Sequence, residues 1–577
     1  MKDVYKLDVF KNLINQFCDE ETKKEFRNNY PDFPKGIDLN YGMGEVIDVD
    51  TLVESIMIDL QLDDQTIAKI KNVMNSLPKE VEKENKTLMT DLYELTMSDI
   101  YYNGGMKDWT GYFDLFHRRN VFNGGYQISA GLEEAIEYIK NFHFSEEDIE
   151  YLRGTGKFNE NFLEYLKNIR FTGNVWAVPD GTPIFPNEPN MTIEAPIIEG
   201  QILETALLTA FNSASLASTA AKRITEVADG RPVAEFGSRR VRGGIDATLV
   251  ESKYAYMGGC SATSNTLAGK LYDIPETGTI AHSLVQAFDD EYEAFLTYAK
   301  NAPDKNKLTL LVDTYDTIGG ILNAIRLQKE YLDPLGCKLA GIRIDSGDLV
   351  YLTKEARRMF IEAGMDYVQI CVSNGLDVDS LQDLLNRGAE IDTLGIGDNI
   401  VAPRERADHV YKLVAVQKEK GGEITSRIKV SGETAKTINP GFKKVVRFYD
   451  KDTNKVLGDT IFLRDEEINE ENYTLVDHNN TWKKTELTNY TVRNLQVPIF
   501  VNGELVYDIP SLKLRREYTN EQYQTLTDRI TDPTNPHTYY VDLSENLRNL
   551  KEEMLHKAIL DVEQRKQAYQ KSLGEIK

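Results

Sequence analysis

Five short motifs in the middle of the chain carry residues that could act on a phosphorylated sugar. Each follows an apolar run with the pattern of a β-strand and adds arginine, histidine, carboxylate or glycine where that run ends. In β/α barrels the catalytic groups lie at the carboxyl ends of the strands, so the order of the motifs predicts one shared active site. The motifs are EFGSRR (235–240), GTIAHS (278–283), DTYDT (313–317), RIDSGDL (343–349) and GIGD (395–398).

The first motif places two adjacent arginines just after a glycine. Arg239 and Arg240 at a barrel mouth suit phosphate or pyrophosphate, because a guanidinium binds such anions through two charge-assisted hydrogen bonds. For either arginine alone, a surface ion pair with a nearby acid is the simpler interpretation. The phosphate hypothesis therefore depends on the neighbouring motifs.

The RIDSGDL motif puts a cation and an anion on one face of a strand. Arg343 and Asp345 are two residues apart, and strand side chains alternate with period two. Asp345 then precedes a helix, which it could cap. It could equally hold ribose hydroxyls or support positive charge on the sugar, and the sequence leaves both alternatives open.

A histidine and two glycine motifs complete the predicted site. His282, between Thr279 and Ser283, could act as a base, an anion contact or a phosphate acceptor, or be a structural histidine. Glycines in SNG (373–375) and GIGD let the backbone approach a phosphate. Aromatic rings that could stack on a flat substrate are Tyr93 and Phe236, although most aromatics at such spacing belong to a core.

The composition limits the class of partner. The chain has 577 residues and a formal net charge of −25, which argues against a nucleic-acid partner because phosphate backbones need a basic face. Four scattered cysteines without a CxxC pair favour a reducing cytoplasm. The sequence shows no signal peptide and no apolar run long enough for a membrane span, so we expect a cytoplasmic protein.

The first 86 residues are expected to form a helical extension of unknown role. Amphipathic stretches at 9–26 and 50–74 flank a proline- and glycine-containing break at 31–36, and a charged connector occupies 79–86. We predict further segments at 87–210, 211–425 and 426–577.

Short apolar runs alternate with helices between about 232 and 397, which predicts βαβ units and a parallel sheet. Six or seven such units would close an irregular β/α barrel. Strands are expected at 112–119, 232–236, 254–259, 278–283, 309–314, 339–345, 367–373 and 391–397. Helices are expected at 90–102, 126–140, 146–169, 203–225, 286–300, 317–332, 348–364 and 377–388. Hairpins are expected at 445–463 and 497–507, and 535–555 should end in a helix.

These motifs together resemble the nicotinate phosphoribosyltransferase family of type II phosphoribosyltransferases. The similarity spans about residues 88–558 and includes TDLYELTM, FDLFHRR, SAGLEEAIEYI, ATSN, SNGLD, NPGFKKVVRFYD and NPHTYYVDLSENL beside the five motifs. The resemblance implies a barrel beside an α/β domain built from both ends of the chain. It also implies transfer of phosphoribose from phosphoribosyl pyrophosphate to nicotinate with ATP hydrolysis, Mg²⁺, and a homodimer with shared active sites.

The resemblance also implies a role for each candidate residue, although it assigns no metal ligand. Phe236 and Tyr93 would sandwich the pyridine ring, with the helix of Tyr93 and Asp91 coming from the neighbouring subunit. The other roles are phosphate or pyrophosphate binding for Arg239, ribose binding for Asp345, contact with the nicotinate carboxylate for Arg343, His282 and Ser283, phosphorylation by ATP for His282, and 5′-phosphate binding for Gly375, Gly395 and Gly397.

Two positions depart from the family pattern. Asp398 stands where threonine is usual, and a carboxylate beside a phosphate is repulsive unless it points away or shares Mg²⁺. Ser261 stands where nicotinamide-using relatives carry an aspartate, which favours an anionic substrate. The alternatives are a nicotinamide transferase, a quinolinate transferase, which needs more basic residues, and a regulatory protein that docks a partner through the extension.

Overall fold

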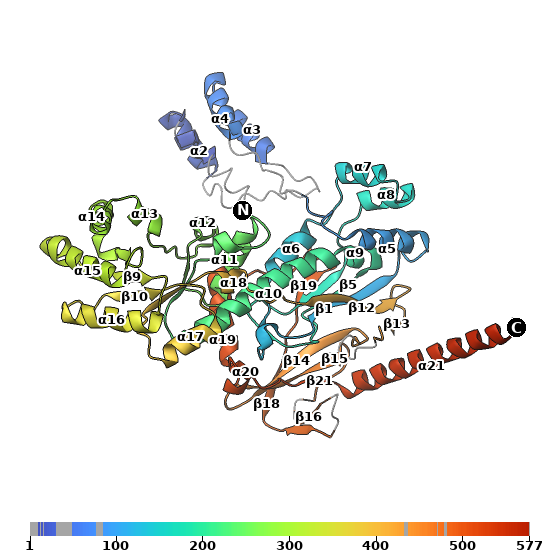
Figure 1. Ribbon diagram of the computed structural model, residues 1–577. Coiled ribbons are helices and arrows are strands. Elements are labelled where there is room, and N and C mark those ends of the chain that lie inside the picture. The colour runs from blue at the N-terminus through green and yellow to red at the C-terminus, as the bar shows by residue number, and fades with distance from the viewer. Residues whose placement is uncertain are drawn as a thin grey trace. The chain divides into compact units, whose positions relative to one another are not determined.

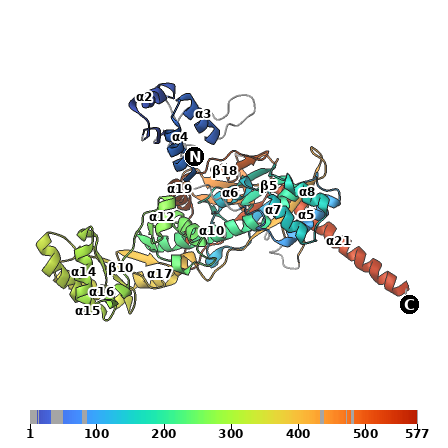
Figure 2. The same cartoon turned by 90° about the horizontal axis from the view of Figure 1, so that it is seen from above.

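The computed structural model describes residues 10–30 except 12 and 16, 49–76, 85–431, 437–469, 471–477 and 482–575. The chain divides into two compact units, Met1–Asn85 and Lys86–Lys577. Figures 1 and 2 show the ribbon from two directions. None of the helices in the described ranges combines the length and apolar character that crossing a bilayer requires.

The first unit is a small helical bundle with its own core, and its helices agree with the helical character predicted for this segment. Phe10, Ile14, Phe26, Ile56 and Ile70 are almost completely buried together. The amphipathic stretch at 50–74 forms two helices rather than one, and the predicted break at 31–36 and most of the connector at 79–86 lie outside the described residues. The helices are α2 (Glu20–Asn29), α3 (Val49–Asp59) and α4 (Asp64–Ser76).

The second unit contains a seven-stranded antiparallel sheet built from both ends of the chain, which confirms that part of the predicted fold. Side chains along β1 alternate between two cores: Phe113 and Leu115 face one, Tyr112 and Phe116 the other. In sheet order the strands are β13 (Ile424–Ser426), β12 (His409–Gln417), β1 (Thr110–His117), β5 (Met191–Pro196), β3 (Asn174–Ala177), β19 (Val497–Val501) and β20 (Glu504–Leu505).

Helices cover this sheet and share its apolar core with the strands. The helix predicted at 146–169 is two helices, and the start of the segment predicted helical at 126–140 is a short strand that pairs with β4. The helices are α5 (Leu92–Asn103), α6 (Leu132–Lys140), α7 (Glu146–Gly154), α8 (Glu160–Lys167) and α9 (Ile197–Ile202), and the short strands are β2 (Gln127–Ile128) and β4 (Pro183–Ile184).

A six-stranded parallel sheet forms a further part of this unit (Figure 1). Its ladder runs from β7 to β8, and within residues 85–431 no ladder joins these two edge strands, so closure into a barrel stays a prediction. In sheet order the strands are β7 (Ala262–Thr263), β6 (Val233–Glu235), β11 (Thr393–Ile396), β10 (Gln369–Val372), β9 (Gly341–Ile344) and β8 (Thr309–Leu311).

The predicted helices between these strands are present with shifted ends. Helix α16 starts after Asp348, whose side chain accepts a hydrogen bond from the Tyr351 backbone N–H at 3.2 Å and caps the helix. The helices are α12 (Thr266–Tyr272), α13 (His282–Gln286), α14 (Glu291–Asn301), α15 (Thr317–Leu327), α16 (Leu349–Glu362), α17 (Val378–Asn386) and α18 (Asp398–Val401).

Two predicted strands of this region are wrong. Residues 254–259 end α11 (Ala247–Met257) and its turn, where Tyr254 and Met257 are fully buried. A short apolar run buried on all sides has no periodicity that separates helix from strand. Residues 278–281 form no strand, and α13 begins at His282; the segment is largely exposed, so it lacks the burial of a parallel strand.

Helix α10 (Glu204–Val227) packs along α11 through small side chains. A Cβ added at Gly258 would meet the Ser218 carbonyl oxygen, so only glycine allows this approach. The predicted helix at 203–225 is therefore confirmed, and its small-residue face is a packing surface.

The C-terminal segments form both predicted hairpins and a long helix. The tip of the second hairpin has Asn502 and Gly503 with positive φ, as a two-residue hairpin turn requires. A four-stranded sheet has the order β18 (Tyr490–Asn494), β14 (Lys443–Asp450), β15 (Val456–Leu463) and β21 (Val541–Leu543). The remaining elements are β16 (Tyr473–Val476), β17 (Lys484–Leu487), α19 (Leu512–Gln524), α20 (Asp528–Thr531) and α21 (Glu545–Glu575).

Candidate active site

Three side chains at the carboxyl ends of β9 and β10 bind one another. Arg343 donates from Nη2 to Asp345 Oδ1 at 2.8 Å and from Nε to Ser373 Oγ at 2.8 Å. Ser373 in turn donates to the same Asp345 oxygen. Because β9 and β10 are parallel, their ends meet at one edge of the sheet. Both of these hydrogen bonds to Asp345 go to Oδ1, and within the described residues its Oδ2 accepts none.

His282 faces this cluster from the start of α13. Its Nε2 lies 3.9 Å from Asp345 Oδ2 and 3.9 Å from Asp313 Oδ1, while its Nδ1 lies 3.1 Å from Thr314 Oγ1. The contact with Thr314 orients the ring, so that the other nitrogen points between two carboxylates. The segment before it is also tied in, since Arg343 Nη1 donates to Thr279 Oγ1 at 3.1 Å.

Asp313 is a site residue that was missing from our candidates, although its motif was among the five. Its side chain is 1% exposed, and its Oδ2 accepts the Asp345 backbone N–H at 2.9 Å and the Ser346 hydroxyl at 2.6 Å. Its Oδ1 is buried without a hydrogen-bond partner and faces His282. A carboxylate two residues after β8, in register with Asp345 after β9, was the signal that could have identified it.

Asp345 is held as a charged carboxylate. Burial acts to raise the pKa of Asp345, but the hydrogen bonds from Ser373 and Arg343 outweigh it, so its pKa lies below the ordinary range. The alternative in which Asp345 caps α16 is wrong, because Asp348 is the cap. The side chain is therefore available to a ligand.

The loop after β6 packs against the loop after β11. A Cβ added at Gly395 would lie 2.5 Å from the Phe236 ring, and one added at Gly397 would be 3.2 Å from the Phe236 carbonyl oxygen. The Arg343 guanidinium lies 5.6 Å from the centre of that ring. Phe236, Gly395 and Gly397 thus meet at the same strand ends as Arg343.

A buried carboxylate fixes the turn that follows Phe236. Glu235 accepts hydrogen bonds from the Gly237 backbone N–H, from Ser252 Oγ at 3.0 Å and from Thr263 Oγ1 at 2.6 Å, and it is fully buried. Three donors satisfy both carboxylate oxygens, so Glu235 positions the loop and does not face a ligand.

The predicted phosphate-binding residues Arg239 and Gly375, and the predicted nicotinate contact Ser283, lie around this cluster outside the strands. Arg239 is exposed after Gly237, with no side-chain hydrogen bond or ion pair within the described residues. Gly375 has a φ of +58°, and its carbonyl oxygen accepts from Asn399 Nδ2 at 2.7 Å. Ser283 follows His282 in α13 and is exposed.

Tyr93 and Asp91 are the two candidates that a single chain does not bring to the cluster. They lie at the start of α5, which packs on α9 and lies away from β9 and β10 in both views (Figures 1 and 2). Tyr93 is 46% exposed, and burial together with the charge of Glu204 raises its pKa. Asp91 is the N-cap residue of α5, where its backbone N–H donates to Thr205 Oγ1 at 3.2 Å.

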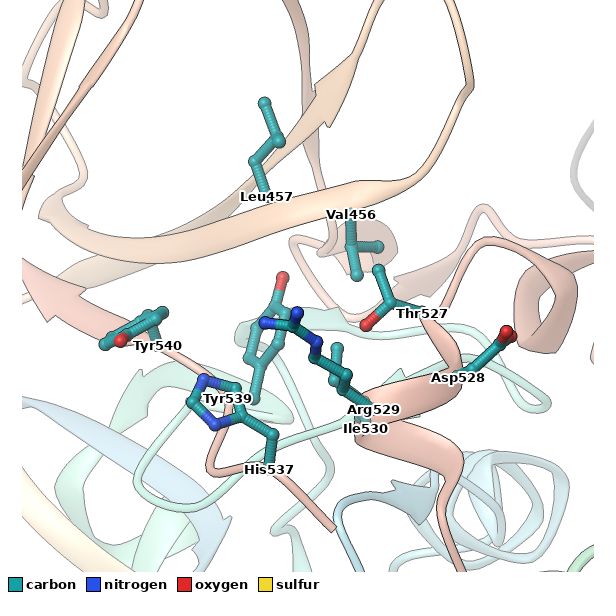
Figure 3. Close-up of a pocket in the computed structure, with 9 residues that line it drawn as sticks. All are labelled: Val456, Leu457, Thr527, Asp528, Arg529, Ile530, His537, Tyr539 and Tyr540. Atoms are coloured by element: carbon teal, nitrogen blue, oxygen red, sulfur yellow. The ribbon is translucent and has the colours of Figure 1, made fainter.

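A separate cavity of about 430 Å³ lies between β15 and the segment around α20 (Figure 3). None of the candidate residues above lines it. Its lining consists of Val456, Leu457, Thr527, Asp528, Arg529, Ile530, His537, Tyr539 and Tyr540.

Comparison with known families agrees with this geometry. The model of the nicotinate phosphoribosyltransferase (NAPRTase) family matches residues 232–455, and the models of its N-terminal and C-terminal domains match 88–212 and 442–551. The chain belongs to the nicotinate phosphoribosyltransferase family. The resemblance drawn from the motifs is therefore confirmed, and residues 1–87 lie outside all three nicotinate phosphoribosyltransferase matches.

Several known nicotinate phosphoribosyltransferases are similar over most of their length. The enzyme of that name from Bacillus subtilis (strain 168) is 38% identical over 485 residues, covering 83% of this chain and 97% of its own. The Caenorhabditis elegans protein of that name is 32% identical, covering 80% and 92%. A crystal structure of human nicotinic acid phosphoribosyltransferase superposes with a TM-score of 0.69 at 28% identity, covering 81% of this chain and 99% of that one.

Proposed function

We propose that this chain joins nicotinate to phosphoribosyl pyrophosphate, giving nicotinate mononucleotide and pyrophosphate. The observation that carries the proposal is the cluster of Arg343, Asp345, Ser373 and His282 at adjoining strand ends, beside the ring of Phe236. Membership of the family and the names of its relatives support the same reaction.

Asp345 would stabilise the sugar as it becomes positively charged. The pyridine nitrogen attacks the anomeric carbon while the bond to pyrophosphate breaks and its electron pair leaves with the pyrophosphate. The charged carboxylate, fixed by Ser373 and Arg343, would hold the ribose hydroxyls and offset this charge. Most of the rate enhancement would come from holding the two reactants in line.

Arg343 and Phe236 would bind the pyridine acid. All three of the nitrogens of Arg343 have partners, so the guanidinium is already oriented near the ring, where it favours a carboxylate over a neutral amide. Position 261 also favours nicotinate, because it carries a serine and offers no carboxylate to accept the amide N–H of nicotinamide. The Ser261 hydroxyl instead donates to the Val233 carbonyl oxygen at 3.0 Å. Ser283 lies beside His282 and would contact the same carboxylate of nicotinate.

The loops after β6, β10 and β11 would hold the phosphates. Arg239 carries a charge without an internal partner in the described residues, and Gly375 has no atom that a Cβ there would meet. Gly397 lets its loop pack on the Phe236 backbone, whereas Gly395 is buried against the Phe236 ring and would act by seating that ring beside the phosphates. Backbone N–H groups and a guanidinium together bind phosphate oxygens without a basic surface.

His282 would accept the γ-phosphoryl group of ATP on Nε2 with ADP as the leaving group, and water would later take this group as inorganic phosphate and restore the free imidazole. Its Nε2 faces Asp313 and Asp345, and two carboxylates beside a phosphoryl group require a cation. The described residues contain no group of three or more metal-binding side chains. Two carboxylate oxygens and substrate phosphates are nevertheless the donor set that Mg²⁺ prefers, so Asp313 and Asp345 would hold it. Bound there, Mg²⁺ would neutralise the phosphates.

A second copy of the chain would complete the site. Tyr93 and Asp91 lie away from Phe236 in their own chain, and Tyr93 is half exposed. We infer a homodimer in which Phe236 stacks on one face of the pyridine ring and the partner's α5 covers the other face. The free cysteines favour a reducing compartment, the cytoplasm, as the place of the reaction.

The test is an assay of the full chain with nicotinate, phosphoribosyl pyrophosphate and Mg²⁺, with and without ATP. We expect equal amounts of nicotinate mononucleotide and pyrophosphate, formed faster with ATP. Absence of the mononucleotide under both conditions would overturn the proposal.

A further inference from the structure

Two exposed side chains of opposite charge connect the loops after β6 and β11. Arg240 Nε lies 3.5 Å from Asp398 Oδ1, and the two side chains are 60% and 54% exposed. Asp398 follows Gly397 directly, so its carboxylate stands beside the backbone expected to meet a phosphate. The sequence left two arrangements open for the Asp398 carboxylate: pointing away from the phosphate, or sharing Mg²⁺ with it. The ion pair with Arg240 is a third arrangement.

The loops do not need this ion pair to stay together. The Phe236 backbone N–H donates to the Ile396 carbonyl oxygen at 2.8 Å, and Gly237 packs tightly against Gly397 and the Val401 side chain. The backbone therefore fixes the separation of the two loops. The ion pair between Arg240 and Asp398 instead changes the net charge that these loops present to an anion.

A phosphate ester can compete for Arg240. Exposed ion pairs contribute little stability because water screens them and two flexible side chains must be ordered. A phosphate carries more charge than a carboxylate, and it binds a guanidinium through two parallel hydrogen bonds. Once Arg240 has turned to the phosphate, the Asp398 carboxylate remains nearby and repels it. Asp398 thus opposes phosphate binding in two ways.

We propose that Asp398 sets the affinity of these loops for phosphate esters, pairing with Arg240 in the free protein and releasing it when phosphoribosyl pyrophosphate binds. The inference rests on the proposed function, in which these loops hold the substrate phosphates. Nicotinate mononucleotide keeps the 5′-phosphate of the substrate, so the same carboxylate also weakens the hold on the product and speeds its release.

The charge can be removed with little change of shape by Asp398→Asn. We expect this variant to bind phosphoribosyl pyrophosphate about two- to fivefold more tightly at low ionic strength, with a smaller gain at high salt. Arg240→Gln should weaken binding, and the gain from Asp398→Asn should shrink in its presence. Asp366→Asn, an exposed acid at the opposite end of the sheet after α16, is the control for the change in net charge.

Isothermal titration of the full-length variants with phosphoribosyl pyrophosphate and Mg²⁺, and separately with inorganic phosphate, measures these affinities without turnover. Weaker binding by Asp398→Asn would overturn the inference and indicate a Mg²⁺ ligand. Affinity equal to that of Asp366→Asn would overturn it as well. Turnover of nicotinate by the unmodified chain is measured in parallel: its presence with unchanged affinities rejects only this inference, whereas its absence rejects the proposed function.

Discussion

At the scale of single residues, the strand-end side chains are held by one another. Arg343 reaches Thr279, Asp345 and Ser373 at once, and Asp313 supports the backbone N–H of Asp345. Each functional group therefore has a fixed orientation before substrate arrives, which is how a site gains rate from positioning. Replacing one group should affect chemistry more than stability.

The first prediction concerns Asp345→Asn. The variant keeps the shape of the side chain but loses the charge that offsets the developing positive sugar, so turnover should fall by about 10²- to 10³-fold. Steady-state rates and a thermal melt check this, with Asp366→Asn as the control. A large loss of melting temperature that parallels the loss of turnover would instead indicate a structural role.

The second prediction concerns His282→Ala. Without the imidazole, ATP should no longer stimulate turnover, while slower ATP-independent turnover persists. The measurement compares initial rates with and without ATP, and His556→Ala, an exposed histidine on α21, is the control. An equal loss under both conditions would argue that His282 contacts substrate and accepts no phosphoryl group.

At the scale of elements, the sequence predicted those that carry a clear period or a turn signal. The strand β1, the long period of α10 and the Asn502–Gly503 turn all appear as expected. Strand ends were also predictable, because Arg343 and Asp345 sit where an apolar run stops. The local pattern failed at 254–259, where burial on all sides hides the helical period, and at 278–281.

Contacts between distant segments could not be read from local patterns. The pairing of Arg240 with Asp398 joins loops about 160 residues apart, and the unpartnered oxygen of Asp313 appears only once β8 and α13 are in place. Residue types indicated the chemistry of the site, and the fold decided which groups face one another.

The third prediction concerns Glu199 in α9, which accepts hydrogen bonds from the Thr172 backbone N–H at 2.7 Å and from Thr172 Oγ1. Burial raises its pKa to about 7, against an ordinary value of 4.5. The folded protein therefore holds this proton more tightly than the unfolded chain, so stability is lost as pH rises from about 4.5 to about 7. The Glu199→Gln variant carries an uncharged side chain at every pH. Its melting temperature relative to that of the unmodified chain should therefore rise as pH increases from about 4.5 to about 7. A difference that does not change with pH would contradict the assignment.

At the scale of the whole molecule, the chain consists of a catalytic unit and a separate helical unit. The helical unit has its own core, and the family matches begin only at residue 88. Every candidate site residue lies in the catalytic unit. The extension is therefore a second folded unit, added before the region that the nicotinate phosphoribosyltransferase family models match.

The fourth prediction is that deletion of residues 1–85 leaves turnover of nicotinate within about twofold of the full chain, because this unit has its own core and carries none of the candidate site residues. Initial rates and a sizing measurement of the proposed dimer check this. A loss of turnover with an intact dimer would assign part of the site to the extension.

The most direct test of the account supplies nicotinate, nicotinamide and quinolinate together, at equal concentration, with phosphoribosyl pyrophosphate, ATP and Mg²⁺, and identifies the products by mass. The account predicts nicotinate mononucleotide as the dominant product, and its loss in Asp345→Asn. Nicotinamide mononucleotide as the main product, or equal yields from the unmodified chain and the variant, would contradict it.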